Sequence, residues 1–402
     1  MDQRETRYHN KSDKPDNLVK RENEIFERSL AIEEQLPYFM KSFFIYLKTS
    51  VLPLSRLAYL GDIQFFCHYL IKETEITQAA SIKDITKEEF NDITAKDINI
   101  FIGDYCTRYK IIKENIITVY ENGNRSLARK KSSLSVLFKF LYRDKIIERN
   151  ITDSLNPIRL PKPGEKEIKT LEQDEVMRML DAAQSGEGLT KKELDYWRKT
   201  KKRDKAILVL FVTYGLRLYE LQHLNISSFN FNRGDFKIYR KRGKETSMPL
   251  NKSVESSIKD YLFNERAPED RLKSEYKDAL FLSLQGRRMT ERAIRELVKK
   301  YTSIGMATSR ASGYSPHKLR ATAATSLIEQ GNSIFDVQNL LDHENVTTTQ
   351  LYAAHKKHAK QELIRNFEWL DNFDTSGHKK NSQDLLNLEA NKLKNRGTQD
   401  EE

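Results

Sequence analysis

Cysteine is scarce in this chain, with two residues in 402. Cys67 and Cys106 form no Cys-x-x-Cys pair, so the sequence indicates neither a structural zinc site nor a disulfide framework. We interpret both as buried free thiols in a reducing compartment. Long apolar runs are also missing, because no segment reaches the ~18 uninterrupted apolar residues that a membrane helix needs. The N-terminus is polar and charged rather than leader-like, and we expect a cytoplasmic or nucleoid-associated protein without membrane contact.

Acidic residues are outnumbered by basic ones. The chain carries 69 Lys and Arg against 58 Asp and Glu, which gives a formal net charge of +11. This excess favours a polyanionic partner, with nucleic acid first and an anionic membrane surface second. A length of 402 residues also exceeds what one hydrophobic core usually serves, so two domains are expected.

The N-terminal part of the chain is predicted to hold an extension and a helical domain. Residues 1–35 are polar with little periodicity, apart from a helix that starts near their end, and cannot bury much apolar surface. Residues 36–155 repeat apolar side chains at helical spacing and are predicted to form a helical domain. Thr94 and Asp97 resemble a capping box that starts one of its helices.

A further helix of this domain is predicted to start near Ser126, with one apolar and one basic face. The apolar stripe comprises Leu127, Leu134, Phe138 and Leu141. The basic residues are Arg125, Arg129, Lys130 and Lys131. They are candidate DNA-binding residues, and the alternative is an ordinary solvated helix face.

A proline-rich linker separates this domain from the next. Residues 156–169 contain three prolines among lysines, and proline blocks helix continuation. Residues 170–373 then show helical patterns with one stretch of alternating apolar residues around Arg233 and Gly234, which predicts a small antiparallel sheet. Residues 374–402 form a polar tail that we expect to be mobile unless it docks on a partner.

The segment from Ser315 to Arg320 combines a helix start with two basic side chains. Ser315 occupies an N-cap position and Pro316 the first helical position, so the phase of the helix is known. His317 and Arg320 are three residues apart and therefore share a face. Free N–H groups of a first helical turn favour an anion such as phosphate.

Two other motifs, combined with His317 and Arg320, indicate a particular function. Arg217 follows a glycine-containing helix break at Gly215, and Glu220 lies one turn on, where it can hold the guanidinium. Further along, the segment Leu341-Asp342-His343 is followed by Tyr352, which lies nine positions after His343. Together the three motifs resemble the tyrosine recombinase (phage integrase) family, which carries G-L-R-x-x-E-L, H-x-x-R, and L-G-H followed nine positions later by a nucleophilic tyrosine.

The resemblance implies the identity of the catalytic residues. They are Arg217, Lys241, His317, Arg320, His343 and the nucleophile Tyr352. Lys241 comes from a turn of the small sheet where the family's glycines are shifted, so Lys244 is the alternative for its role. The same turn adds Arg240, Arg242 and Lys244 as DNA-binding residues. Asp342 stands where the family usually has glycine and places a carboxylate beside His343, which would either orient that histidine or lower the local affinity for anions.

The chemistry that the resemblance implies suits these residue types. The Tyr352 phenol attacks a DNA phosphate and forms a 3′-phosphotyrosyl bond, while Arg217 and Arg320 stabilise the charge on the non-bridging oxygens. His317, with an ordinary pKa near ~6.5, is the candidate base, and the lysine protonates the leaving 5′-oxygen. His343 donates a further hydrogen bond. We expect no metal and no cofactor.

The resemblance also implies an architecture and a role. The fold is expected to be mainly α, a two-domain clamp. Residues 36–155 would form an all-helical DNA-binding (core-binding) domain, and residues 170–373 a mainly helical catalytic domain that bears a small antiparallel sheet. Its expected partners are double-stranded DNA and further copies of the chain, as a dimer on each site and a tetramer in synapsis. Within the family the chain looks most like the XerS-type Xer recombinases of Firmicutes. Chromosome dimer resolution and mobile-element integration or excision both remain open, and a catalytically silent DNA-binding regulator is the alternative.

Overall fold

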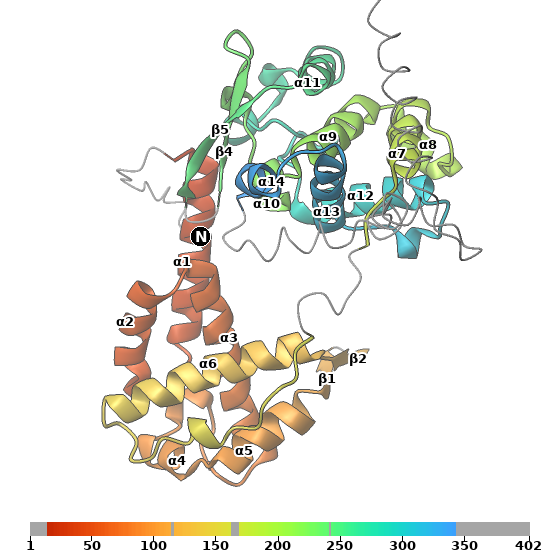
Figure 1. Cartoon of the computed structure of the whole chain (residues 1–402). Helices are drawn as coiled ribbons and strands as arrows, with labels where there is room; N and C mark the ends of the chain where they lie inside the picture. Colours follow the sequence, from red (N-terminus) through yellow and green to blue (C-terminus); the bar gives the residue numbers. More distant parts are fainter. Residues whose placement is uncertain (1–13, 114–115, 162–168, 241–242, 343–402) are drawn as a thin grey trace, which may run out of the picture.

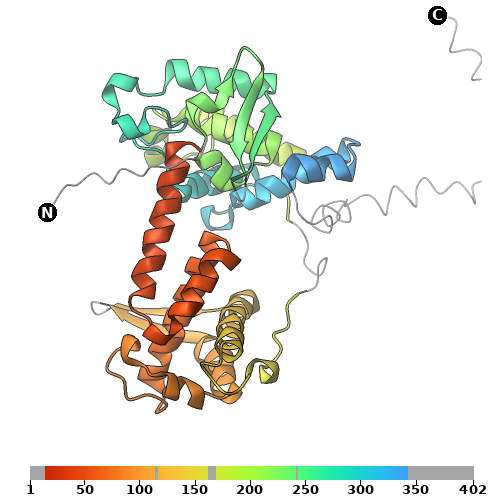
Figure 2. The ribbon, with the colours of Figure 1, turned by 90° about the vertical axis from the view of Figure 1, so that its left-hand side faces the viewer.

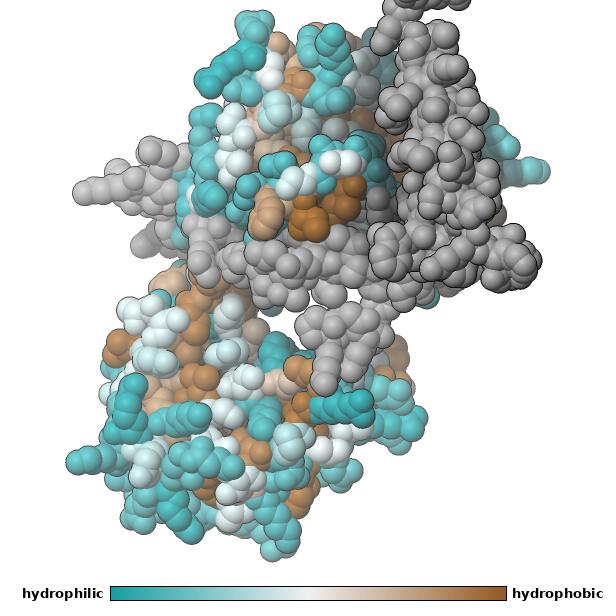
Figure 3. Space-filling model, viewed as in Figure 1, coloured by the Kyte–Doolittle hydropathy of each residue, from teal (hydrophilic) through white to brown (hydrophobic). Residues whose placement is uncertain are grey.

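The chain folds into two halves that are bridged by its first helix. The computed structural model describes residues 14–113, 116–161, 169–240 and 243–342. Helix α1 (Asp16–Glu33) runs from the sheet-bearing C-terminal half to the N-terminal half (Figures 1 and 2). Among the helices of these residues, none combines the length and apolar character required to cross a membrane. Figure 3 shows hydrophilic residues over much of one face of both halves.

The N-terminal half is built around an aromatic core. Phe66 packs against Phe101 with ring centroids 4.9 Å apart, and Phe90 stacks on Phe138 at 5.5 Å. The predicted apolar stripe of the basic helix is buried at all four positions, so this prediction is confirmed. The Thr94–Asp97 capping box is also present. The helices are α2 (Lys41–Ser50), α3 (Pro53–Glu73), α4 (Lys87–Asp92), α5 (Ala95–Ile100) and α6 (Asn124–Arg143).

A β-hairpin interrupts these helices, so the expectation of an all-helical N-terminal domain is wrong at this point. Strands β1 (Arg108–Lys113) and β2 (Ile116–Glu121) pair antiparallel, from Arg108 opposite Glu121 to Lys113 opposite Ile116. Isoleucine, valine, threonine and tyrosine are the residue types that favour a pleated strand. Tyr109 joins the hairpin to the domain, because its ring lies 4.9 Å from that of Phe65.

Helix α1 corrects the expectation that a helix starts only near the end of residues 1–35. It starts at Asp16 and buries Leu18, Ile25 and Ser29. Its C-terminal end is tied to α3 by an ion pair between Glu33 and the buried Arg56. Its first turns contact the C-terminal half through polar pairs: Asn17 Nδ2 with His223 Nδ1 (2.9 Å), Lys20 Nζ with Glu275 (2.8 Å), Arg21 Nη1 with His223 Nε2 (2.9 Å) and Arg21 Nη2 with Glu291 (3.1 Å).

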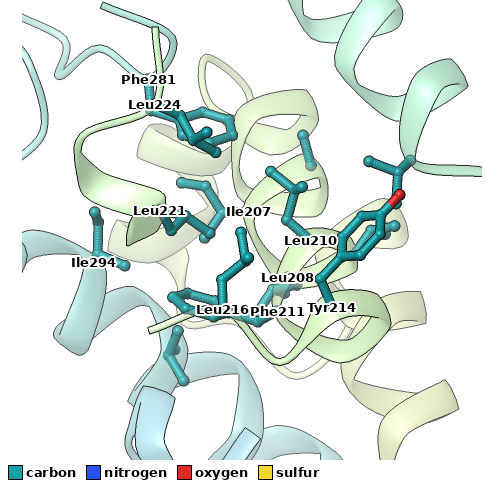
Figure 4. Close-up of a cluster of buried hydrophobic side chains, with 14 of the residues drawn as sticks. Ile207, Leu208, Leu210, Phe211, Tyr214, Leu216, Leu221, Leu224, Phe281 and Ile294 are labelled. Atoms are coloured by element: carbon teal, nitrogen blue, oxygen red, sulfur yellow. The ribbon is translucent and has the colours of Figure 1, made fainter. Parts of the chain in front are cut away.

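The C-terminal half surrounds one buried helix, α9 (Lys201–Tyr214). Its side chains Ile207, Leu210 and Phe211 point into the cluster of apolar residues drawn in Figure 4. The other helices are α7 (Gln173–Ser185), α8 (Lys191–Trp197), α10 (Leu218–Gln222), α11 (Lys252–Asn264), α12 (Glu291–Gly305), α13 (Pro316–Glu329) and α14 (Ile334–Leu341). The predicted helical character of this half is therefore confirmed.

The predicted small antiparallel sheet is present at one side of this half (Figure 1). Its strands are β3 (Phe229–Asn230), β4 (Asp235–Tyr239) and β5 (Glu245–Pro249), in that order. Strands β4 and β5 pair from Asp235 opposite Pro249 to Tyr239 opposite Glu245. Tyr239 and Glu245, the last pair of this ladder, therefore flank the β4–β5 turn.

Candidate active site

Gly215 and Arg217 shape one side of the candidate active site. Helix α9 ends at Gly215, whose φ of +56° suits glycine, and an added Cβ would lie 2.7 Å from Leu341 Cδ2. Arg217 then caps α10. Its Nη1 donates to Glu220 Oε1 at 2.7 Å, and its backbone N–H donates to Glu220 Oε2 at 2.8 Å. The prediction that Glu220 holds this guanidinium is confirmed.

Helix α13 supplies the second arginine. It begins at Pro316 after Ser315, as predicted, and buries Leu319, which fixes the direction in which Arg320 points. The Arg320 side chain is buried, and its Nη1 donates to Gly215 O at 2.6 Å. His317 lies exposed one turn earlier on the same helix. Arg320 therefore ties α13 to the helix break that places Arg217.

Three arginines converge on the C-terminal end of α14. The last carbonyls of a helix have no partner within it and carry partial negative charge, so guanidinium groups suit them. The three bonds run from Arg240 Nη2 to Leu340 O (2.7 Å), from Arg320 Nη2 to Leu341 O, and from Arg217 Nη2 to Asp342 O (2.8 Å). Both predicted catalytic arginines, Arg217 and Arg320, therefore reach the last two described residues of the chain, Leu341 and Asp342.

Arg240 has a different environment from the one expected of a DNA-contacting residue. Its side chain is buried, next to Glu220 at 3.9 Å, and burial lowers the pKa of its guanidinium. Its Nε is buried and has no hydrogen-bond partner among the described residues. In this structure Arg240 connects β4 to α14 from inside the domain and is not at the surface.

The β4–β5 turn lies next to α14. The turn is closed by Arg240 N donating to Lys244 O at 2.8 Å and by Gly243 N donating to Arg240 O at 3.1 Å. Lys244 is 67% exposed, and its Nζ lies 3.5 Å from Asp342 Oδ1. A cation of this turn thus reaches the same helix end as Arg217.

Four of the predicted site residues lie outside the described part of the chain. They are Lys241, Arg242, His343 and Tyr352. The neighbouring residues Arg240, Gly243 and Asp342 are described, and each takes part in hydrogen bonds. Lys241 and Lys244 both remain predictions for the acid that protonates the leaving oxygen.

The basic residues of α6 fall into two groups. Arg125 and Arg129 are exposed, although Arg129 also pairs with the buried Asp62. Lys130 is buried, with Nζ 3.2 Å from Asp62 Oδ1 and 4.6 Å from the Phe65 ring centroid. Lys131 Nζ donates to the backbone of Asn156 at 2.7 Å. Lys130 is therefore an internal residue in this structure, and Arg125 and Arg129 present the charge of α6 to the outside.

The environment of His317 gives a prediction about pH. Although the His317 side chain is exposed, desolvation by the surrounding protein, together with the positive charges of Arg320 and Lys318, lowers the pKa of His317 below its ordinary value. A lowered pKa keeps the imidazole neutral, and able to accept a proton, at pH values below about 6.5. We expect the single-turnover rate of DNA cleavage to stay level as pH falls to about 6.5 and to decline only below it.

The measurement is a pH series of single-turnover cleavage, with DNA binding measured at every pH as the control. An acidic limb with its midpoint at or above the ordinary histidine value, at constant DNA occupancy, would contradict the role of His317 as base.

A helix break places Arg217, and a second helix places Arg320 against the same helix end, as expected for the catalytic domain of a tyrosine recombinase. Comparison with known proteins supports this class. Residues 169–359 match the phage integrase family. The tyrosine recombinase XerC of Natranaerobius thermophilus is 33% identical over 321 residues, which cover 78% of this chain and 96% of the relative. The tyrosine recombinase XerD of Staphylococcus haemolyticus is 30% identical, over 60% of this chain and 76% of the relative.

Solved structures share the fold. The Tn1549 transposon integrase in complex with circular intermediate DNA superposes with a TM-score of 0.51 at 18% identity, covering 84% of this chain and 98% of that one. The XerH recombinase bound to its difH substrate gives a TM-score of 0.50 at 18% identity, over 79% and 80% of the two chains. The chain belongs to the tyrosine recombinase family and is a site-specific DNA recombinase.

Proposed function

We propose that this recombinase cleaves and rejoins double-stranded DNA through Tyr352. The observation that carries the assignment of roles is the convergence of Arg217 and Arg320 on the end of α14, immediately before His343. Two guanidinium groups at one point can bind the non-bridging oxygens of a phosphate, and they stay charged throughout the reaction. Arg217, which is 32% exposed, is the one that reaches the surface.

The reaction proceeds in one displacement at phosphorus. The Tyr352 oxygen forms a bond to phosphorus and loses its proton to His317, while the bond from phosphorus to the 5′-oxygen breaks. Lys241, or Lys244 in its place, gives the leaving oxygen its proton. Arg217, Arg320 and His343 stabilise the negative charge on the non-bridging oxygens. The phosphotyrosyl bond retains the energy of the broken linkage, so the reverse attack by a 5′-hydroxyl rejoins the strand without ATP.

The assembly that suits this reaction is a clamp around DNA. We assign residues 36–155 to DNA binding, residues 170–373 to catalysis and residues 156–169 to the linker. The exposed Arg125 and Arg129 of α6 supply phosphate contacts in the N-terminal half. Two protomers occupy one recombination site and four exchange strands in synapsis. A cytoplasmic, nucleoid-associated protein of the XerS type would resolve chromosome dimers, whereas an element-borne copy would integrate and excise DNA.

The test is covalent trapping. Wild-type protein is incubated with sheared genomic DNA of the organism that carries the gene, and DNA that stays bound to protein in detergent is sequenced. We expect adducts at 3′ ends at a discrete site, and complete loss of adducts in Tyr352→Phe with DNA affinity nearly unchanged, because the substitution removes one oxygen and no predicted phosphate contact. Tyr196→Phe, at an exposed tyrosine of α8, is the matched control and should react like the wild type.

Two results would contradict this proposal. Adducts in Tyr352→Phe would mean that another residue is the nucleophile. Specific DNA binding without any adduct in the wild type would instead support the catalytically silent regulator.

A further inference from the structure

Asp342 occupies an unusual backbone position for its residue type. It is the residue after the last turn of α14, with φ 51° and ψ 53°. This left-handed conformation is normally taken by glycine, which is the residue that tyrosine recombinases usually have there. Aspartate tolerates the conformation better than most residues, yet it adds a carboxylate that glycine lacks. The side chain therefore introduces a negative charge at a point where the fold does not require one.

The carboxylate lies between two cations of the candidate site. Its Oδ2 is 3.6 Å from Arg217 Nη1, and its Oδ1 is 3.5 Å from Lys244 Nζ. The two cations come from different elements, α10 and the β4–β5 turn, and they meet on this one side chain. An anion held by an arginine on one side and a lysine on the other is the arrangement in which proteins bind phosphate oxygens.

Arg217 also contacts a second carboxylate, that of Glu220, with which the contact of Asp342 can be compared. Glu220 is fully buried and accepts from Arg217 at 2.7 Å, so it is part of the fold. Asp342 is 25% exposed, and its contacts with Arg217 (3.6 Å) and Lys244 (3.5 Å) are longer than the 2.7 Å contact between Arg217 and Glu220. The longer, partly solvated contacts are weak enough to be exchanged for an incoming anion.

We propose that the Asp342 carboxylate occupies the position of a DNA phosphate oxygen between Arg217 and Lys244 in the DNA-free protein, and that it must leave both cations before the scissile phosphate binds. The proposal rests on the proposed function for the identity of the anion. The side chain thus acts as an internal competitor that lowers the affinity of the site for phosphate until DNA contacts elsewhere hold the substrate in place.

The first experiment uses inorganic phosphate as the probe, so it does not depend on recombination. Isothermal titration at low ionic strength compares the wild type with Asp342→Asn, which keeps the tolerance for left-handed backbone but removes the charge. We expect Asp342→Asn to bind phosphate about 2- to 5-fold more tightly, the range in which exposed ion pairs act. Asp235→Asn is the matched control, because it removes one charge at the far end of the same hairpin. Equal affinity in wild type and Asp342→Asn would overturn the proposal.

The second experiment measures single-turnover cleavage of the trapped DNA site at subsaturating concentration. Asp342→Asn and Asp342→Gly should both lower the DNA concentration needed for half-maximal cleavage. A gain in the glycine variant alone would assign the effect to backbone relief and would also overturn the proposal. If Asp342→Asn binds phosphate more tightly but neither protein forms an adduct with DNA, the proposed function fails while the anion site stands.

Discussion

Replacing Arg320 by alanine should lower the rate of DNA cleavage by at least about 10²- to 10³-fold, the usual loss when one donor to a developing oxyanion is removed. The substitution should also affect the stability of the fold. Arg320 donates to Gly215 O and to Leu341 O from a buried position, and alanine leaves both carbonyls without this donor. We therefore also expect the free energy of unfolding to fall by roughly 1–3 kcal/mol for each buried group left unpaired.

A second substitution separates the two effects. Arg320→Lys keeps the positive charge, but the lysine ammonium lacks the planar guanidinium that can donate to two carbonyls and a phosphate together. The cleavage rate of Arg320→Lys should therefore stay well below that of the wild type. Arg178→Ala is the matched control, because Arg178 donates to Gly305 O at the end of α12, away from the site. Cleavage is measured below the unfolding temperature of every variant. A wild-type rate in folded Arg320→Ala would show that Arg320 only holds α13 and α14 in place.

Replacing Asp62 by alanine should give the largest loss of stability in the N-terminal half, about 3–5 kcal/mol, because it leaves a buried charge unpaired. Asp62 is buried on α3 and accepts from Lys130 Nζ at 3.2 Å and from Ser133 Oγ at 3.0 Å. It also pairs with Arg129. Without Asp62 the Lys130 ammonium would be left inside the domain without its anionic partner, which is costly for a buried charge.

The measurement is hydrogen exchange read by mass spectrometry, which reports residues 36–155 separately from the catalytic half. The double variant Asp62→Leu/Lys130→Met removes both charges and should recover most of the lost protection. Asp144→Ala, which removes an exposed ion pair with Arg143, should cost less than about 1 kcal/mol. If Asp62→Ala is no less protected than Asp144→Ala, Lys130 is not held by a buried ion pair, and its earlier assignment to DNA contact regains support.

Features that depend on neighbours in sequence could be predicted. The bond of Arg217 to Glu220 follows from a spacing of three residues after a helix break, and the start of α13 follows from serine and proline at fixed positions. The capping box at Thr94 obeys the same local rule. These arrangements need no knowledge of the rest of the fold.

Features that depend on contacts between distant parts of the chain could not be predicted from the sequence. The position of Arg240 at the turn of the sheet suggests DNA contact, but the alternation of β4 places it on the buried face with Phe236 and Ile238. Nothing in the sequence indicated that its buried guanidinium would find the end of α14, a hundred residues on. The pairing of Asp342 with Lys244 is long-range in the same way.

Helix α1 has a consequence for how DNA enters the protein. The bonds that join its first turns to the catalytic half are ion pairs and hydrogen bonds, among them Arg21 with Glu291 and Lys20 with Glu275. Such pairs weaken as ionic strength rises. Salt is therefore expected to have two effects on this recombinase: it screens the DNA phosphates, and it weakens the polar contacts between α1 and the catalytic half. At high salt the affinity for DNA should fall, while the two halves should separate more easily and so allow DNA to enter between them.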